Sequence, residues 1–119
     1  MDTELEYDKY RFIRKKVVDT HGILYIVTNQ SMEDQNIFKV GLTKNLKARL
    51  HVMDTSHTVG DHMYAVYSQE FQDVRLAEKM VHYKLRRYRM SERREFFQAD
   101  KSDIVDAVNC VSQWLEHDT

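Results

Sequence analysis

Hydrophobic and polar positions change their spacing several times along the chain, and each change predicts a new element. Three runs rich in β-branched and aromatic residues are typical of strands: 23–28 (ILYIVT), 37–41 (IFKVG) and 63–68 (MYAVYS). The polar segment 29–36 predicts a turn between the first two runs, which would make them an antiparallel hairpin with a long loop. A short extended piece, 95–98 (EFFQ), follows later in the chain.

Three other segments have the three-and-four spacing of amphipathic helices. The first begins after Thr43 or Asn45, either of which can cap it; the second is capped by Asp73, and the last by Ser102. Their apolar stripes are Leu46, Leu50 and Met53 in the first, Val74, Ala77, Val81, Leu85 and Tyr88 in the second, and Ile104, Val108, Val111 and Leu115 in the last. Trp114, beside the last stripe, is expected in the core with Phe96 and Phe97.

The order of elements is β–β–α–β–α–(β)–α, which predicts an α+β fold in which a small three-stranded antiparallel sheet is flanked by helices. A chain of 119 residues allows one domain of ordinary size. We therefore expect a single domain over residues 22–119, ending in the C-terminal helix, and an N-terminal extension over residues 1–21. Within the extension, residues 5–16 could form a short helix.

Composition narrows the class of protein. Apolar residues make up 42% of the chain and charged residues 31%, as in ordinary globular proteins. Cys110 is the single cysteine, so an internal disulfide is excluded and an intracellular location, cytoplasm or nucleus, is expected. The sequence has no apolar run of the ~20 residues that span a bilayer, and its acidic, polar start argues against a secretory signal.

The distribution of charge carries more information than its total. The formal net charge is −1, from 18 basic and 19 acidic residues, which at first argues against a nucleic-acid partner. However, 17 of the 18 basic residues fall in three stretches, 9–16, 39–49 and 75–94, whereas acids gather at both ends. If these stretches share one face, they can bind phosphates; otherwise they are solvated helix faces.

Several short motifs in the predicted elements resemble those of the GIY-YIG nuclease superfamily. Gly22-Ile23-Leu24-Tyr25-Ile26 and Lys39-Val40-Gly41 are similar to its two strand motifs. The similarity continues through Thr43, the segment Asn45–Leu50 and Leu76-Ala77-Glu78, and it ends at Arg94-Glu95-Phe96-Phe97. This last motif resembles the branch found in phages, large DNA viruses and some fungi, so the resemblance implies a viral or phage origin.

The resemblance implies a metal-dependent DNA endonuclease. Tyr25 and Lys39 would activate the attacking water, because a neighbouring cation can stabilise the phenolate of a tyrosine. Arg49 would bind the phosphate through its planar donor fork. Glu78 would hold Mg²⁺ or Mn²⁺, since one carboxylate together with water and phosphate oxygens can suffice for Mg²⁺. This hypothesis requires that Tyr25 and Lys39 point to the same face of the sheet.

The partner expected for such an enzyme is nucleic acid, and specifically DNA. Because no separate specificity module is evident, a homodimer or a second protein that supplies specificity is also expected. The cations expected to contact the nucleic-acid backbone are Lys44, Lys47, Arg86, Arg87, Arg89, Arg93 and Arg94.

Simpler interpretations of the same residues remain open. Tyr25 could be cross-strand packing, Arg49 a surface arginine, and Glu78 the ion-pair partner of Arg75 or His82. The motif's second tyrosine is replaced by Lys39, its histidine would fall at Met53, and its late asparagine has no clear counterpart. The alternative function is therefore a catalytically degenerate nucleic-acid-binding module of the same fold. A third is a protein-interaction domain.

Overall fold

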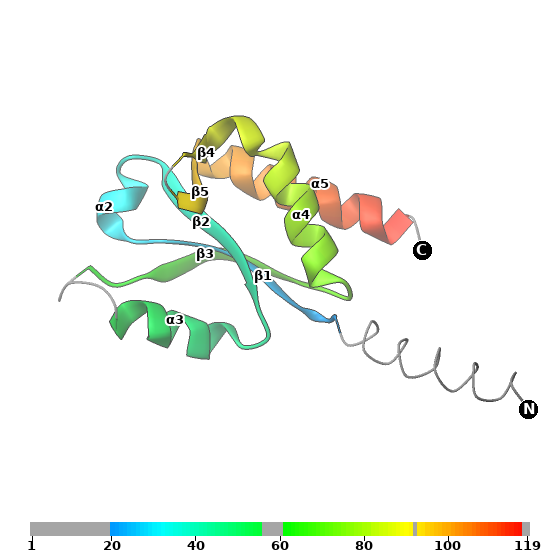
Figure 1. Cartoon of the computed structure of the whole chain (residues 1–119), viewed down its shortest axis with the longest axis horizontal. Coiled ribbons are helices and arrows are strands. Elements are labelled where there is room, and N and C mark those ends of the chain that lie inside the picture. Colours follow the sequence, from blue (N-terminus) through cyan, green and yellow to red (C-terminus); the bar gives the residue numbers. More distant parts are fainter. Residues whose placement is uncertain (1–19, 56–60, 92, 118–119) are drawn as a thin grey trace, which may run out of the picture.

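The strands pair antiparallel in one sheet with the order β3-β1-β2-β5-β4 (Figure 1). The structure is a computed structural model, and it describes residues 20–55, 61–91 and 93–117. The strands are β1 (Gly22–Thr28), β2 (Ile37–Thr43), β3 (Tyr64–Phe71), β4 (Arg89–Met90) and β5 (Arg93–Gln98). The helices are α2 (Gln30–Glu33), α3 (Leu46–Thr55), α4 (Val74–Lys84), the short 3-10 helix η1 (Arg86–Tyr88) and α5 (Lys101–His117).

Alternation along the strands divides the interior into two clusters on opposite faces of the sheet. Leu24 and Ile26 of β1 face the larger cluster, which α4 and α5 cover with residues such as Val81 and Val108. The intervening Tyr25 faces the smaller cluster, which lies under α3. Figure 1 shows α3 on one side of the sheet and α4 with α5 on the other. The α+β class is confirmed, with helices on both faces.

The predicted sheet was too small, because it has five strands rather than three in the described residues. β4 is two residues long, too short to show any periodicity. β5 is rich in charge and lies between β2 and β4, with Phe38 paired to Phe97. Phe97 is fully buried while Glu95 is exposed. A single buried aromatic residue therefore fixes β5 to the core, although most of the strand is polar.

The predicted helix starts are largely confirmed. Asn45 caps α3 by accepting a hydrogen bond from the amide of Ala48 at 3.0 Å, and Asp73 caps α4 by accepting one from the amide of Leu76 at 3.2 Å. α5 begins at Lys101, one residue before the expected cap Ser102. The polar turn at 29–36 holds the short helix α2. The helix expected over residues 5–16 lies outside the described residues.

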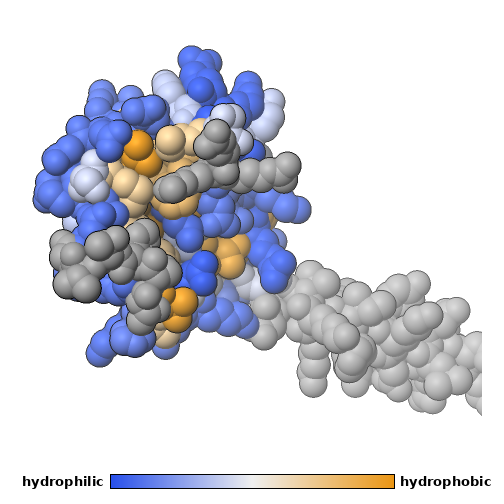
Figure 2. Space-filling view, turned by 60° about the vertical axis from the view of Figure 1, so that its left-hand side comes forward, coloured by the Kyte–Doolittle hydropathy of each residue, from blue (hydrophilic) through white to orange (hydrophobic). Residues whose placement is uncertain are grey.

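The prediction that Trp114 belongs to the core was wrong, since 55% of its surface is exposed. It lies three residues beyond the buried Val111, at the margin of the stripe that α5 presents to the sheet. The face of the molecule in Figure 2 is mostly hydrophilic, with small separate hydrophobic patches. No helix in the described residues is both long and apolar enough to cross a membrane.

Candidate functional site

Strand β2 is flanked unevenly along its length. β1 pairs with it from Thr43 to Lys39, whereas β5 pairs with it only from Lys39 to Ile37 in the described residues. Along the segment 40–43, β2 is therefore paired with β1 on one side, and its other side is an open edge that side chains can approach. At this edge, residues from the two faces of the sheet can approach each other, which the interior of the sheet would otherwise prevent.

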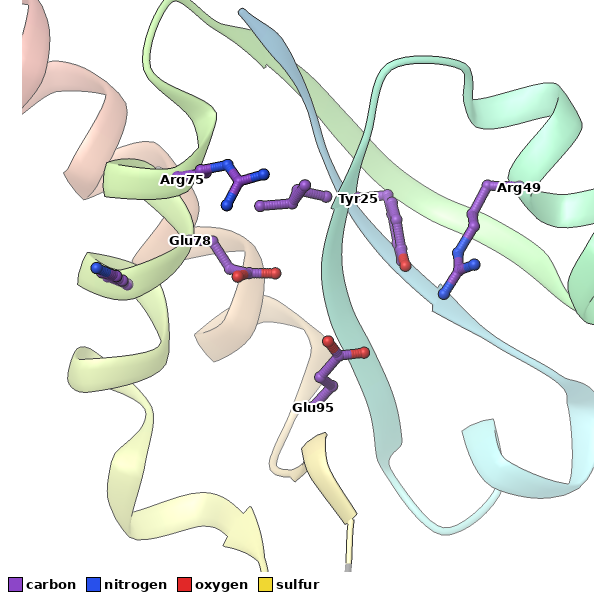
Figure 3. A pocket seen from close by; sticks show the side chains of 7 residues that line it. Tyr25, Arg49, Arg75, Glu78 and Glu95 are labelled. Carbon is purple, nitrogen blue, oxygen red and sulfur yellow. The ribbon is translucent and has the colours of Figure 1, made fainter. Parts of the chain in front are cut away.

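A pocket of about 360 Å³ lies at this edge of β2 (Figure 3). α3 contributes Arg49 and β1 contributes Tyr25 from one face of the sheet, while α4 contributes Glu78 from the other and β5 contributes Glu95. The complete lining is Tyr25, Leu42, Arg49, Arg75, Glu78, Lys79 and Glu95. Three of the four residues predicted to be catalytic thus meet in one cavity.

Gly41 allows Tyr25 to reach the pocket. The two residues are direct partners in the β1–β2 ladder. A Cβ atom at Gly41 would lie 2.5 Å from the Tyr25 hydroxyl oxygen and 2.7 Å from Cζ, so the ring crosses the strand through the space that the missing side chain leaves. Tyr25 is only 1% exposed, so its ring has little freedom to move away. Gly41 belongs to the strand motif noted in the sequence, but its role becomes visible only in the structure.

Arg49 is the cation that acts on the Tyr25 hydroxyl. Its guanidinium donates a hydrogen bond to the Tyr25 hydroxyl oxygen, and Figure 3 shows the two groups facing each other. Burial raises the pKa of Tyr25 above its ordinary value, although the hydrogen bond and the charge of Arg49 act in the opposite direction. The Tyr25 hydroxyl therefore stays protonated near neutral pH in the ligand-free protein.

Lys39 does not line the pocket with Tyr25, as it would have to do if its charge stabilised a Tyr25 phenolate. The register confirms that Tyr25 and Lys39 share a face of the sheet, because Tyr25 pairs with Gly41 and Lys39 pairs with Val27. However, Lys39 does not line the pocket; its Nζ lies 3.6 Å from an oxygen of Glu95, and its side chain is 13% exposed. Lys39 is thus a neighbour of the carboxylate Glu95, and the role of cation beside Tyr25 falls to Arg49.

Glu78 and Glu95 are the two carboxylates of the pocket. Burial, with a contribution from the charge of Glu95, raises the pKa of Glu78, whereas His82 and Arg75 lower it. His82 is itself held in place, since its Nε2 lies 2.9 Å from the carbonyl oxygen of Val40 on the open edge of β2. Glu78 is thus half-buried beside a second carboxylate, an arrangement that disfavours its ionised form.

The predicted nucleic-acid-binding residues form two groups. Lys44 and Lys47 are exposed at the start of α3, whereas Arg86, Arg87 and Arg89 are exposed on η1 and β4. Arg93 and Arg94 begin β5, but their side chains are outside the described residues.

Two further cations, Arg75 and Lys79, line the pocket and were not among the predicted site residues. They fall in the basic stretch 75–94, but only the fold of α4 shows that they face the pocket. Glu95 was likewise missed as a site residue, although it stands in the Arg94–Phe97 motif.

Comparison with known proteins assigns the family. Residues 22–112 match the model of the T5orf172 domain, and the chain belongs to that family. The expected membership of the GIY-YIG superfamily was therefore wrong: the short motifs that suggested it are weak one by one, and the match over most of the chain is to the T5orf172 domain.

Two similar proteins come from Invertebrate iridescent virus 6. Protein 315L, named for a KilA-N domain, is 32% identical over 93 residues, which are 77% of this chain and 39% of that protein. Protein 460R is 35% identical over 89 residues, 74% of this chain and 39% of that protein. The chain thus spans about two fifths of the length of the curated relatives it matches. No solved structure matches it significantly. The expected viral or phage origin agrees with the source of these relatives.

Proposed function

We propose that this domain is a metal-dependent endonuclease that hydrolyses phosphodiester bonds in DNA. Family membership supports the coarser statement, a DNA-binding or nuclease-like module. The observation that carries the finer proposal is the convergence of an arginine, a tyrosine and two carboxylates in one pocket at the open edge of β2. Hydrolysis of a phosphodiester needs groups that hold the phosphoryl oxygens and groups that neutralise the developing charge, and this set of side chains includes both kinds.

The two carboxylates fit a hard divalent cation. Glu78 and Glu95 offer oxygen ligands, and the described residues hold no cluster of three or more histidine, cysteine, aspartate or glutamate residues. That poverty of protein ligands suits Mg²⁺ or Mn²⁺, because Mg²⁺ keeps several waters and commonly uses one or two carboxylates with substrate phosphates. When bound, such an ion stabilises negative charge on the phosphoryl group and lowers the pKa of bound water.

The remaining roles follow from hydrogen bonding within the pocket. Arg49 has further donors besides the one that it gives to Tyr25, and they can hold a phosphate oxygen. Because the Tyr25 hydroxyl is protonated and accepts from Arg49, its own hydrogen is free to be donated to the phosphate or the attacking water. We therefore assign Tyr25 a hydrogen-bonding role rather than that of a general base. Lys39 orients Glu95 through their ion pair.

The test is a cleavage panel with Mg²⁺, Mn²⁺ or EDTA across single-stranded, duplex, nicked and branched DNA, with RNA for comparison. Cleavage is expected only with the metals, and Arg49→Ala should lower its rate by roughly a hundredfold or more. Glu78→Gln should abolish cleavage, while the matched change Glu70→Gln, in a carboxylate on β3 outside the pocket, should leave it intact. Absence of cleavage on every substrate would overturn the proposal.

The second candidate is a nucleic-acid-binding module without turnover. It is favoured by the protonated state of the Tyr25 hydroxyl, which cannot act as a base in that form. It predicts salt-dependent binding in EDTA that Glu78→Gln leaves intact, with no cleavage in either metal. The cleavage panel and a binding titration with the same variants separate the two functions.

A further inference from the structure

A second groove, of about 470 Å³, lies between α4 and α5 and is built differently from the first pocket. Two large aromatic side chains stand at its surface: Tyr83 is 66% exposed and Trp114 is 55% exposed. The groove is lined by Lys79, Met80, Tyr83, Lys84, Cys110, Val111 and Trp114. Large aromatic side chains that are exposed together on neighbouring helices are typical of a binding surface, because covering them removes apolar area from water.

Cations lie along the groove and against the Tyr83 ring. Lys79 and Lys84 line the groove, and none of its described lining residues is acidic. The Arg86 guanidinium lies 4.0 Å from the centre of the Tyr83 ring, and its Nη1 donates a hydrogen bond to the Tyr83 carbonyl oxygen at 2.8 Å. The ring is thus held by a cation on one face. The surface of the groove is almost wholly apolar, so Lys79 and Lys84 line it with their carbon stems and keep their charged ends in solvent. A polyanion with flat bases matches both features, because its phosphates can meet these cations while its bases cover the apolar surface.

The groove adjoins the proposed nuclease site, because Lys79 lines both. Arg75, Lys79 and Tyr83 follow one another at intervals of four residues and form one row along α4. At 1.5 Å per residue, the row runs about 12 Å from Arg75 to Tyr83. That length spans a few nucleotides of one strand, since even fully stacked nucleotides advance by about 3.4 Å each.

We propose that the α4–α5 groove is a base-stacking subsite for unpaired DNA. A single strand leaves the pocket along Lys79, its phosphates meet the cations of α4 and η1, and its bases stack on Tyr83 and Trp114. Only unpaired nucleotides can do this, because the bases of a duplex are stacked on each other and do not offer their faces to side chains. The path of the strand, from the pocket to the groove, rests on the proposed nuclease function. It implies that the substrate is DNA with a single-stranded arm.

The binding itself can be tested without cleavage, because Trp114 is the only tryptophan of the chain. Its fluorescence in the full chain is followed during titration with a ten-residue oligothymidine and, separately, with a short duplex, both in EDTA. Quenching is expected with the single strand and not with the duplex. Equal quenching by both, or none with the single strand, would overturn the proposal.

Variants locate the contact. Tyr83→Leu should weaken the binding of a labelled oligothymidine by roughly five- to a hundredfold in fluorescence anisotropy, the range found for loss of one base–aromatic stack. Trp114→Leu should do the same, whereas Leu76→Ala, at an exposed position on another side of α4, should have no effect. Unchanged affinity in both aromatic variants would assign the groove to another partner and overturn the proposal.

Failure of the nuclease proposal has a different signature. If Trp114 is quenched by the single strand but no substrate is cut in Mg²⁺ or Mn²⁺, the stacking subsite stands and the nuclease does not. If branched DNA is cut while Tyr83→Leu and Trp114→Leu leave its binding unchanged, the nuclease stands and the subsite does not. A blue shift of Trp114 with rising protein concentration, accompanied by dimerisation, would show that a second copy covers the groove, which also overturns it.

Discussion

At the scale of single residues, the site depends on close approach and burial as much as on reactive groups. Tyr25 reaches the pocket only because Gly41 has no side chain, and Glu78 is half-buried near a second carboxylate. The first feature leaves no room for a side chain at position 41, and the second disfavours the ionised form of Glu78. Two substitutions can therefore separate the requirements of the site from those of the fold.

The first is Gly41→Ala. Its Cβ would overlap the Tyr25 ring, so the ring must be displaced, at a cost of about 1–3 kcal/mol in unfolding free energy. Gly22→Ala is the matched control, because its Cβ would lie 2.8 Å from Cγ1 of Val74, a packing contact away from Tyr25. Thermal unfolding should show similar losses for both variants. The rate of cleavage, measured well below both melting temperatures, should fall far more in Gly41→Ala than in Gly22→Ala. Equal rates in the two variants would show that cleavage does not depend on the position of the Tyr25 ring.

The second is Glu78→Gln, whose effect on stability should depend on pH. Because burial raises the pKa of Glu78, the folded protein holds its proton more tightly than the unfolded chain does. Ionisation therefore costs stability progressively as the pH rises from the ordinary value of about 4.5 through the raised pKa, and fully above it. Below the ordinary value both states are protonated and the cost disappears.

Glu78→Gln should accordingly melt a few degrees higher than the wild type at pH 7 and at the same temperature near pH 4. Glu70→Gln, at a side chain that is 73% exposed, should show little difference at either pH. Scanning calorimetry in the absence of divalent cations is the measurement. A variant less stable than the wild type at pH 7 would mean that Glu78 is an ordinary ion-pair residue.

At the scale of elements, the two faces of the sheet differ in how firmly their helices are held. α4 and α5 pack on a large cluster that includes Leu24, Phe38 and Phe97. α3 packs on a smaller one built from Tyr25, Val27, Met53 and Met63. Arg49 is thus carried by the less anchored helix, while Glu78 is carried by the firmly packed one.

Local opening should reflect this difference. We expect the amides of α3 to exchange with solvent faster than those of α4 and α5, through an opening that does not unfold the whole domain. Hydrogen-exchange mass spectrometry measures this directly. Met53→Ala, which removes a buried contact under α3, should accelerate exchange in α3 selectively. Uniform protection across the three helices would show a single cooperative unit instead.

The sequence predicted long elements well and short ones badly. Stripes such as Val74–Leu85 have enough repeats to define a buried face, and caps such as Asp73 mark a start by a local hydrogen bond. β4 is too short to carry that signal, and its place depends on pairing with β5. The extended piece predicted at 95–98 does lie in β5, but its place beside β2 depends on pairing between distant segments. The site was partly predictable: Tyr25, Arg49 and Glu78 do meet, but the position of Lys39 and the contributions of Arg75, Lys79 and Glu95 depend on contacts between distant segments.

At the scale of the whole molecule, the total charge hides the feature that matters for binding. The chain carries a formal charge of −1, yet Arg75 and Lys79 line the pocket, and further cations are exposed on α3 (Lys47) and η1 (Arg87). Binding to a polyanion depends on these local contacts and the counterions they release, not on the net charge.

DNA affinity should therefore fall steeply with salt, in spite of the acidic total. If about six phosphates are contacted, the association constant should drop by about a thousandfold between 50 and 200 mM salt. Replacing Arg87 or Lys47 by glutamine should reduce the slope of log K against log salt by about 1 each. Lys101, the one basic residue outside the three stretches, provides the matched control: Lys101→Gln makes the same change in net charge and should leave the slope unchanged. Fluorescence anisotropy at several salt concentrations measures these slopes, and equal losses in all three variants would mean that net charge, rather than a basic surface around the pocket, governs binding.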